Sequence, residues 1–574
     1  MKKINLKTTI AVIIITFGYL VATGQNTNLK SVGEQIKFFT DRTLYITGEK
    51  IQFAAYVNIL GNESKGASNK RFELNDSQNC LSNIIYVELI TPDGEKITGE
   101  KFLIEKSFRS GCLPIPKEIV TGIYYLRAYT KYMRNDGPNS YSYLALKVVN
   151  PYKSDILSYK PIEPSLLNDS IKMEDSTVGR DLVTILLDKQ EYTTREGVKI
   201  QIKGSESIRD LNVSVIPSSS IVEGNKIQLQ SEKTPTSSFY FPETNGISLT
   251  GKLMESKSDK FLTNTKVNLS ILGDSKDFMA VLTDSTGRFF FKMPNFKGVR
   301  DVFLCTETMV DSKSTILIDN DFCRNKINIP TPIFKMTEAE KEIAYNMALN
   351  AQIASHFNTQ ISKDSVRIDS KAFYDEPQEK LVLDKYIQLP TLEDYINEII
   401  PTLKVRKHQG RKYFKIFSAQ TEMEIYKPLV LLDLVAIDNP EKILSLSPQS
   451  ISHIEVVNVP YIKGNITYGG IVSIFSKKGD FAGIDLPSSG IFLDYKFFSD
   501  CTITGNGESP TMNQPDCRNT LFWEPNISLN SANPVELSFK TADTPGKYTV
   551  LLRGLTDNGK LVSLKKSFVV QAKN

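Results

Sequence analysis

The sequence contains little of what catalytic and metal-binding sites are usually built from. It has only three His residues, and His356, His408 and His453 stand far apart, so no metal-ligand spacing occurs. Motifs of serine hydrolases, zinc proteases, phosphate-binding loops and dinucleotide sites are also missing. We therefore expect a protein that acts by binding, with no catalytic residue, no cofactor and no metal.

The chain also lacks a strong net charge. Its formal charge is +4, and three of these charges belong to Lys2, Lys3 and Lys7 in the first segment, which leaves +1 for the rest. A nearly neutral chain has no general attraction to phosphates, so we expect no nucleic-acid partner. Basic residues at 404–407 and 411–412 alternate with apolar ones. This pattern predicts a solvated strand face, with an acidic partner surface as the alternative.

No long apolar run lies beyond the N-terminus. Residues 10–21 are largely apolar and follow a positively charged start, and Ala22 and Gly24 supply small residues before a cut at Gln25. We expect residues 1–24 to be a secretory signal peptide. An uncleaved anchor is the alternative, but the apolar stretch is shorter than the ~20 residues that a spanning helix needs. The protein would then be exported to the periplasm or the outer membrane.

The cysteine content fits an exported protein, because disulfides persist in oxidising compartments. The six cysteines are Cys80, Cys112, Cys305, Cys323, Cys501 and Cys517. None lies in a CxxC motif, and many pairings are formally possible. Each pair of sequence neighbours falls within one expected domain. The pairing hypothesis is therefore Cys80–Cys112, Cys305–Cys323 and Cys501–Cys517.

Short runs that alternate apolar and polar residues recur along the chain between Gly, Asn, Asp and Pro turns. This pattern indicates a mainly β fold made of a string of β-sandwich domains plus a small α+β domain. The expected sandwiches are 31–151, 182–242, 246–327 and 486–574; the α+β unit is 380–483; the connectors are 152–181 and 328–379. The second connector should hold a helix capped by Thr337, with Glu340 three residues on. Trp523 is expected to anchor a core.

Several of these segments resemble known families. The first sandwich resembles the macroglobulin-like MG2 domain of secreted Bacteroidetes proteins, through Tyr45, Gly48-Glu49, Phe53, the turn at 92–94 and the strand at 122–130. Segment 246–327, with its turn at 284–287, resembles the carboxypeptidase-regulatory-like domain, a non-catalytic sandwich. Segments 182–242 and 486–574 resemble further macroglobulin- or immunoglobulin-like modules. The Cys-Gly-Glu-Gln thioester run of macroglobulins proper is missing, so covalent protease trapping is not expected.

Segment 380–483 carries the sharpest signal. It combines an amphipathic helix at 391–400, a buried strand at 428–433 and a helix, turn and strand over 443–457. This order resembles the plug domain of TonB-dependent outer-membrane receptors, in particular the SusC-like branch. The matching residues are Asp433, Ile454, Glu455, Val456, Tyr468, Gly469, Lys477, Lys478 and Gly479. Leu434 stands where that family usually has Gly, so we expect a different turn there.

Receptors of this family carry a barrel of about 22 strands after the plug, whereas fewer than 100 residues follow Gly479 here. We therefore expect a plug-like unit without its own barrel. Turn and surface roles for Asp433 and Glu455 are favoured over a catalytic pair.

The expected function is that of a non-catalytic envelope protein that binds an outer-membrane or periplasmic protein. A barrel transporter is one candidate partner, and the oligomeric state is left open. Surface adhesion or a structural spacer is the alternative function, and an enzyme with an unrecognised site is the third.

Overall fold

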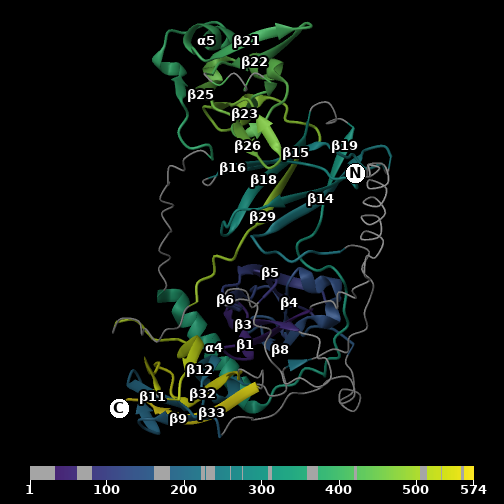
Figure 1. Ribbon diagram of the computed structural model, residues 1–574. Helices are drawn as coiled ribbons and strands as arrows, with labels where there is room; N and C mark the ends of the chain where they lie inside the picture. The colour runs from purple at the N-terminus through teal and green to yellow at the C-terminus, as the bar shows by residue number, and fades with distance from the viewer. Residues whose placement is uncertain are drawn as a thin grey trace, which may run out of the picture.

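The structure is a computed structural model. It describes residues 33–60, 80–160, 181–221, 226–227, 239–258, 260–273, 276–307, 313–357, 373–418, 420, 423, 425–503, 513–531, 533–556 and 561–573. The expected signal peptide and most of the connector 152–181 lie outside these ranges. Within them the strands form three two-sheet sandwiches and one smaller α+β unit, which confirms the expected mainly β fold class. Figure 1 shows these parts stacked along one long axis, with the C-terminus at the lower end. None of the described helices is long and apolar enough to cross a membrane.

The first sandwich lies in the middle of the stack (Figure 1). One sheet has the order β1-β3-β6, from β1 (Gly33–Thr40), β3 (Lys50–Leu60) and β6 (Phe108–Pro114). The other has the order β13-β8-β7-β4-β5, with β2 (Leu44–Ile46) on β8. Its strands are β4 (Ile84–Ile90), β5 (Lys96–Leu103), β7 (Gly122–Tyr129), β8 (Ser142–Val149) and β13 (Lys226–Ile227). Every residue of β4 and β7 is buried, because this sheet is covered on both faces.

The second sandwich corrects the expected domain division. One sheet, β31-β11-β9, contains β9 (Val183–Leu187), β11 (Gly197–Gly204) and β31 (Val535–Lys540). The other, β10-β33-β32-β12-β30, contains β10 (Glu191–Thr193), β12 (Ile208–Pro217), β30 (Phe522–Leu529), β32 (Gly546–Leu555) and β33 (Leu561–Gln571). Most strands of segments 182–242 and 486–574, which we predicted as two separate sandwiches, therefore build one. The few strands of the first segment cannot bury their apolar faces alone, and the last strands complete both sheets.

The third sandwich lies above the first and also takes a strand from late in the chain. Its sheets are β17-β14-β19 and β16-β15-β18-β29. The strands are β14 (Ser248–Glu255), β15 (Lys266–Ile271), β16 (Asp277–Leu282), β17 (Arg288–Lys292), β18 (Val299–Thr306), β19 (Ser314–Ile318) and β29 (Ile491–Lys496). Strand β29 pairs with β18 after the chain has completed the α+β unit. In the sequence, the α+β unit therefore lies between β19 and β29, two strands of the third sandwich.

The connector after the third sandwich returns along the first one. Phe322, Cys323 and Ile329 pack into the same core as β4 and β7, which explains why those strands are buried on both faces. The helix α4 (Glu338–Phe357) then packs against β2. It begins at the expected cap: Glu340 N–H donates to Thr337 Oγ1 over 3.2 Å and Thr337 N–H to Glu340 Oε2 over 2.8 Å. Lys147 of β8 forms an ion pair with Glu340 at 2.8 Å, which holds the helix on the sandwich.

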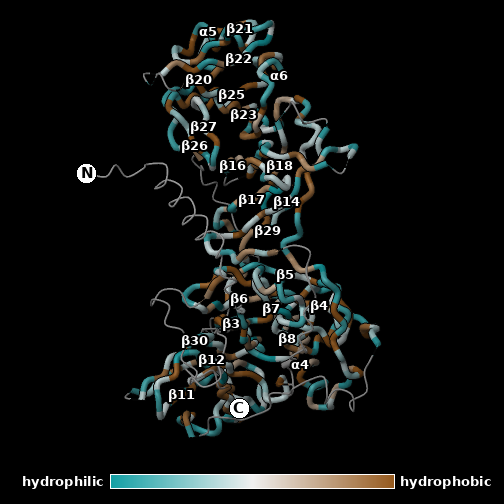
Figure 2. Tube along the Cα trace, turned by 45° about the vertical axis from the view of Figure 1, so that its right-hand side comes forward, coloured by the Kyte–Doolittle hydropathy of each residue, from teal (hydrophilic) through white to brown (hydrophobic). Residues whose placement is uncertain are grey.

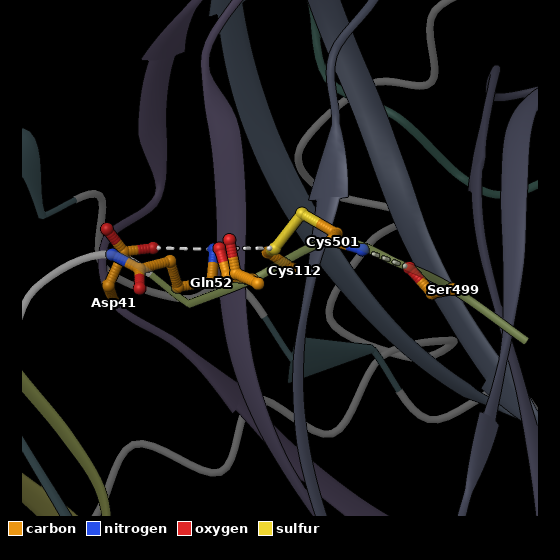
Figure 3. Close-up of a disulfide and its surroundings, with 6 residues drawn as sticks. Asp41, Gln52, Cys112, Ser499 and Cys501 are labelled. Carbon is orange, nitrogen blue, oxygen red and sulfur yellow. Dashed lines mark hydrogen bonds between the residues drawn. A yellow bond between two sulfur atoms is a disulfide. The ribbon is translucent and has the colours of Figure 1, made fainter. Parts of the chain in front are cut away.

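A disulfide bond ties the returning chain to the first sandwich. Cys112 of β6 is bonded to Cys501, which follows β29 and lies 389 residues later in the sequence (Figure 3). The predicted pairs Cys80–Cys112 and Cys501–Cys517 are therefore wrong, and Cys305 and Cys323, both buried, are not joined to each other by the predicted disulfide. Pairing by sequence proximity fails here because the chain leaves the first sandwich and comes back to it.

Trp523 lies at the junction of the first and second sandwiches rather than inside either one. It is fully buried and packs with Phe39 and Tyr56 of the first sandwich and with Leu555 of the second. Tyr56 also donates a hydrogen bond to the carbonyl of Pro525 over 3.0 Å. The expected core role is confirmed, and the core in question is the one that fastens two sandwiches together.

Candidate functional site in the plug-like unit

The plug-like unit, residues 373–484, forms the upper end of the molecule in both views (Figures 1 and 2). Its central sheet has the order β20-β25-β28-β23-β24. The strands are β20 (Glu379–Val382), β23 (Leu429–Leu432), β24 (Val435–Ala436), β25 (Ile451–Val457) and β28 (Ile471–Ser476). The helices are α5 (Leu392–Ile399) and α6 (Pro440–Leu444), and two hairpins are β21 (Leu403–His408) with β22 (Arg411–Ile416) and β26 (Tyr461–Lys463) with β27 (Ile466–Tyr468).

Both faces of this central sheet are covered within the chain. Alternate residues of β23 point to opposite sides, so Val430 and Leu432 join the apolar cluster beneath α5 and the hairpin β21–β22. Leu429 and Leu431 join a second cluster that includes Phe278 of the third sandwich. Ile454 and Val456, two of the motif residues, are fully buried on the first side. The apolar motif positions therefore act in packing.

Asp433 holds a turn together. It accepts hydrogen bonds from Ser476 N–H at 2.8 Å, Ser476 Oγ at 2.6 Å and Phe481 N–H at 2.9 Å. Asp433 and Leu434 both have left-handed backbone angles, with φ of 46° and 71°, so the turn is tight although Leu434 stands where a Gly was expected from the resemblance to SusC-like plugs. The buried Leu434 side chain and its carbonyl, which accepts from Ser270 Oγ over 2.8 Å, hold this conformation against the third sandwich.

Glu455 lies on the second side of the sheet among three donors. Tyr374 Oη donates to it over 2.6 Å, Lys380 Nζ over 2.7 Å, and His453 Nε2 lies at 3.5 Å. Burial alone would raise the pKa of Glu455, but the contacts with His453, Lys380 and Tyr374 outweigh burial and lower this pKa to about 2. The buried position beside Glu455 raises the pKa of Tyr374. This arrangement keeps Glu455 ionised and stabilises the sheet.

Tyr468 and the two glycines after it form a closely packed corner. The Tyr468 ring is buried, and the Nζ of Lys266 lies 5.8 Å from its centroid. A Cβ on Gly469 would lie 2.3 Å from the carbonyl oxygen of Tyr426, and one on Gly470, where φ is 92°, would lie 2.4 Å from that of Val457. The two glycines that follow Tyr468 are therefore required by backbone packing.

The end of the motif is exposed and also structural. Lys477 pairs with Asp384 at 2.9 Å, Lys478 is exposed, and Gly479 takes a turn conformation with φ of 67°. Asp433 and Glu455 have separate sets of hydrogen-bond partners, so the structure does not assemble them as an acid–base pair. Among the described residues no group of His, Cys, Asp and Glu is placed to hold a metal.

Three residues around Glu455 were not anticipated. Tyr374 and Lys380 come from the connector side of the unit, and His453 comes from the same strand as Glu455. The sequence contained one signal for His453. It lies two residues before Glu455 in a predicted strand, so the two side chains must share a face of the sheet. The positions of Tyr374 and Lys380 depend on the pairing of β20 with β25, where Lys380 stands opposite Glu455.

The plug-like unit is fastened to the third sandwich. Lys266 of β15 lies 3.5 Å from Asp438, and Lys463 of β26 lies 3.4 Å from Asp277. The rings of Phe278 and Phe373 pack with centroids 5.9 Å apart. Together with the shared apolar cluster, these contacts hold the unit on the end of the stack.

Similarity to known proteins is found among solved structures. No protein-family model matches the chain, and no curated protein matches it. Among solved structures, Escherichia coli alpha-2-macroglobulin activated by porcine elastase is similar at 10% identity and a TM-score of 0.23, covering 94% of this chain and 44% of that one. Salmonella alpha-2-macroglobulin reacted with methylamine is similar at 9% identity and a TM-score of 0.23, covering 94% and 39%.

A tetra-tandem repeat from the extending region of a large adhesion protein is similar at 7% identity and a TM-score of 0.11, covering 95% and 100%. This chain thus spans less than half of the length of either macroglobulin. These similarities carry no argument about function. The strand pairing itself defines the class of protein, which is a mainly β protein of stacked sandwiches with an inserted α+β unit.

Proposed function

We propose that this chain is an exported, non-catalytic scaffold that presents its plug-like unit to another protein of the bacterial envelope. The resemblance of Asp433, Ile454-Glu455-Val456 and Tyr468-Gly469 to SusC-like plug domains supports a partner at the outer membrane. The carboxylates that could have served catalysis, Asp433 and Glu455, are committed to hydrogen bonds inside the unit. The macroglobulin-like sandwiches would act as the support.

One observation carries the proposal: the unit is held firmly at one end of the stack while apolar side chains remain exposed on its loops. Both faces of its sheet are covered, so contacts with a partner must use these loops. Ile387 is 80% exposed, Ile425 80% and Ile462 65%, the last in strand β26 of the hairpin β26–β27. Exposed apolar side chains on a rigid support are typical of protein-binding surfaces.

Site-specific photocrosslinking in cells tests this proposal. A photoreactive amino acid at Ile462 should give a discrete adduct with an envelope protein, because this side chain is exposed. The matched control places the same amino acid at Lys566, an exposed position on β33 at the other end of the stack. Adducts at neither position, or equal adducts at both, would contradict a partner contact through the plug-like unit.

The alternative is a structural spacer or adhesion module. The observation in its favour is the way the sandwiches are joined, through the disulfide Cys112–Cys501 and the buried junction around Trp523. A spacer needs this stiffness and no specific partner. Protease treatment of intact cells separates the two: cleavage in the sandwiches would favour a surface module, and full protection would favour a periplasmic scaffold.

A further inference from the structure

The hairpin β21–β22 has one apolar face and one basic face. Leu403, Val405, Phe414 and Ile416 are buried beneath it in the cluster around α5. Because side chains alternate along each strand, the residues between them point outward. The outward residues are Lys404, Arg406 and His408 from β21 and Arg411, Tyr413 and Lys415 from β22. No acidic residue lies among them.

The basic face is assembled at a cost to the hairpin. Lys404 stands directly opposite Lys415 on this face, and Lys407 stands directly opposite Lys412 on the other face of the hairpin. Like charges in such positions are destabilising. The turn at Gln409 and Gly410, with φ of 48° and 82°, closes the hairpin tightly and keeps these pairs together. A concentration of positive charge that lowers the stability of the hairpin is explained if an anionic partner binds to this face.

Two of the hairpin's lysines already have partners in the chain. Lys404 Nζ donates to the carbonyls of Asn397 and Ile400 at the end of α5, over 2.6 and 2.9 Å. Lys412, on the other side of the hairpin, pairs with Glu393 at 2.5 Å. By contrast, the side chains of Arg406, Lys407 and Arg411 are exposed and form no ion pair or hydrogen bond with any residue that the structure describes. Uncompensated charge is therefore concentrated at the outer end.

Aromatic side chains accompany this charge. Tyr413 is 41% exposed on the basic face, and Phe417, which follows β22, is 37% exposed. The Nζ of Lys415 lies 5.3 Å from the Phe417 centroid, which places this ring on the same face. The hairpin also lies at the extreme upper end of the stack, where Figures 1 and 2 agree. It can therefore meet a broad surface without obstruction from the sandwiches.

We propose that the outward face of β21–β22 docks on an anionic lipid surface. Lys and Arg neutralise lipid phosphates while Tyr and Phe enter the headgroup layer, which is the pattern of interfacial membrane sites. An acidic protein surface is the rival occupant, and its capture through Arg406 and Arg411 is one outcome of the test. The proposed lipid contact is separate from the proposed contact with an envelope protein. Vesicle binding is measured without that partner, so either proposal can fail while the other stands.

Vesicle cosedimentation with the purified full chain tests the proposal. The probes are vesicles of phosphatidylcholine alone and of phosphatidylcholine with phosphatidylglycerol in equal parts. Each Lys or Arg close to an anionic membrane strengthens binding about fivefold. The variant R406Q/R411Q should therefore bind the anionic vesicles about 25-fold more weakly than the native chain. The native chain should bind neutral vesicles weakly.

The matched control is K547Q/K566Q, which removes two exposed charges from the second sandwich at the opposite end of the stack. It should change binding less than twofold, and both variants should keep the native thermal midpoint. Equal binding to both kinds of vesicle, or equal weakening by the two variants, would overturn the proposal. So would a chain that ignores vesicles but captures an acidic envelope protein through Arg406 and Arg411.

Discussion

Removing the Cys112–Cys501 bond should weaken the folded chain strongly, because this bond closes a very long loop. The two residues are 389 apart in sequence. The chain-entropy relation gives about 6 kcal/mol for a loop of that length, while native disulfides typically contribute about 2–5 kcal/mol when measured. We therefore expect C112S/C501S to lose about 2–5 kcal/mol of unfolding free energy.

The chain contains its own reporter for this measurement. Trp523 is the only tryptophan, and it is buried where the first and second sandwiches meet. Urea unfolding followed by its fluorescence should show a lower midpoint in C112S/C501S. With a slope of about 3 kcal/mol per M, a loss of 3 kcal/mol moves the midpoint by about 1 M. The native chain with reductant should match the variant, and reductant should not affect the variant.

An unchanged urea midpoint would refute this reasoning, because the disulfide would then not restrict the conformations of the unfolded chain. Peptide mapping without reduction provides a separate check. It should recover one cross-linked peptide pair that contains Cys112 and Cys501. A pair that joins Cys80 to Cys112 would show that the chain does not return to β6 in the way described.

Two further predictions concern the plug-like unit. Because hydrogen bonds lower the pKa of Glu455 to about 2, its contribution to stability is complete above pH about 4.5 and is lost as the pH falls toward 2. Because Lys380 is half-exposed, this contribution to the free energy of unfolding should be about 1–2 kcal/mol. The variant E455Q should lack this stabilisation at pH 7. The acid-unfolding curves of the variant and the native chain should converge near pH 2. The substitution G470A should cost about 2–4 kcal/mol, since its Cβ would lie 2.4 Å from the Val457 carbonyl oxygen. The control G479A, also at positive φ but with nothing within 4 Å, should cost about 1 kcal/mol by urea unfolding, and equal losses would contradict the packing explanation.

Local features of this protein could be predicted from the sequence because they depend on neighbouring residues. The amphipathic spacing at 391–400 produced α5 (Leu392–Ile399), and Thr337 with Glu340 produced the start of α4. Alternating apolar residues produced strands at 451–457 and 471–476. In each case a helical or strand period, or a cap, stabilises the element within a few residues.

The sequence by itself therefore determined the mainly β class and, in the plug-like unit, the helix at 391–400 and the strands at 428–433, 451–457 and 471–476. Only the tertiary structure decided that the last strands complete the sandwich begun at Val183, that Cys112 bonds Cys501, and that Glu455 meets Tyr374 and Lys380. The physical reason is that strand pairing and burial join residues hundreds of positions apart. A local alternation of apolar and polar residues predicts that one face of a strand is buried, but it does not predict which distant segment covers that face.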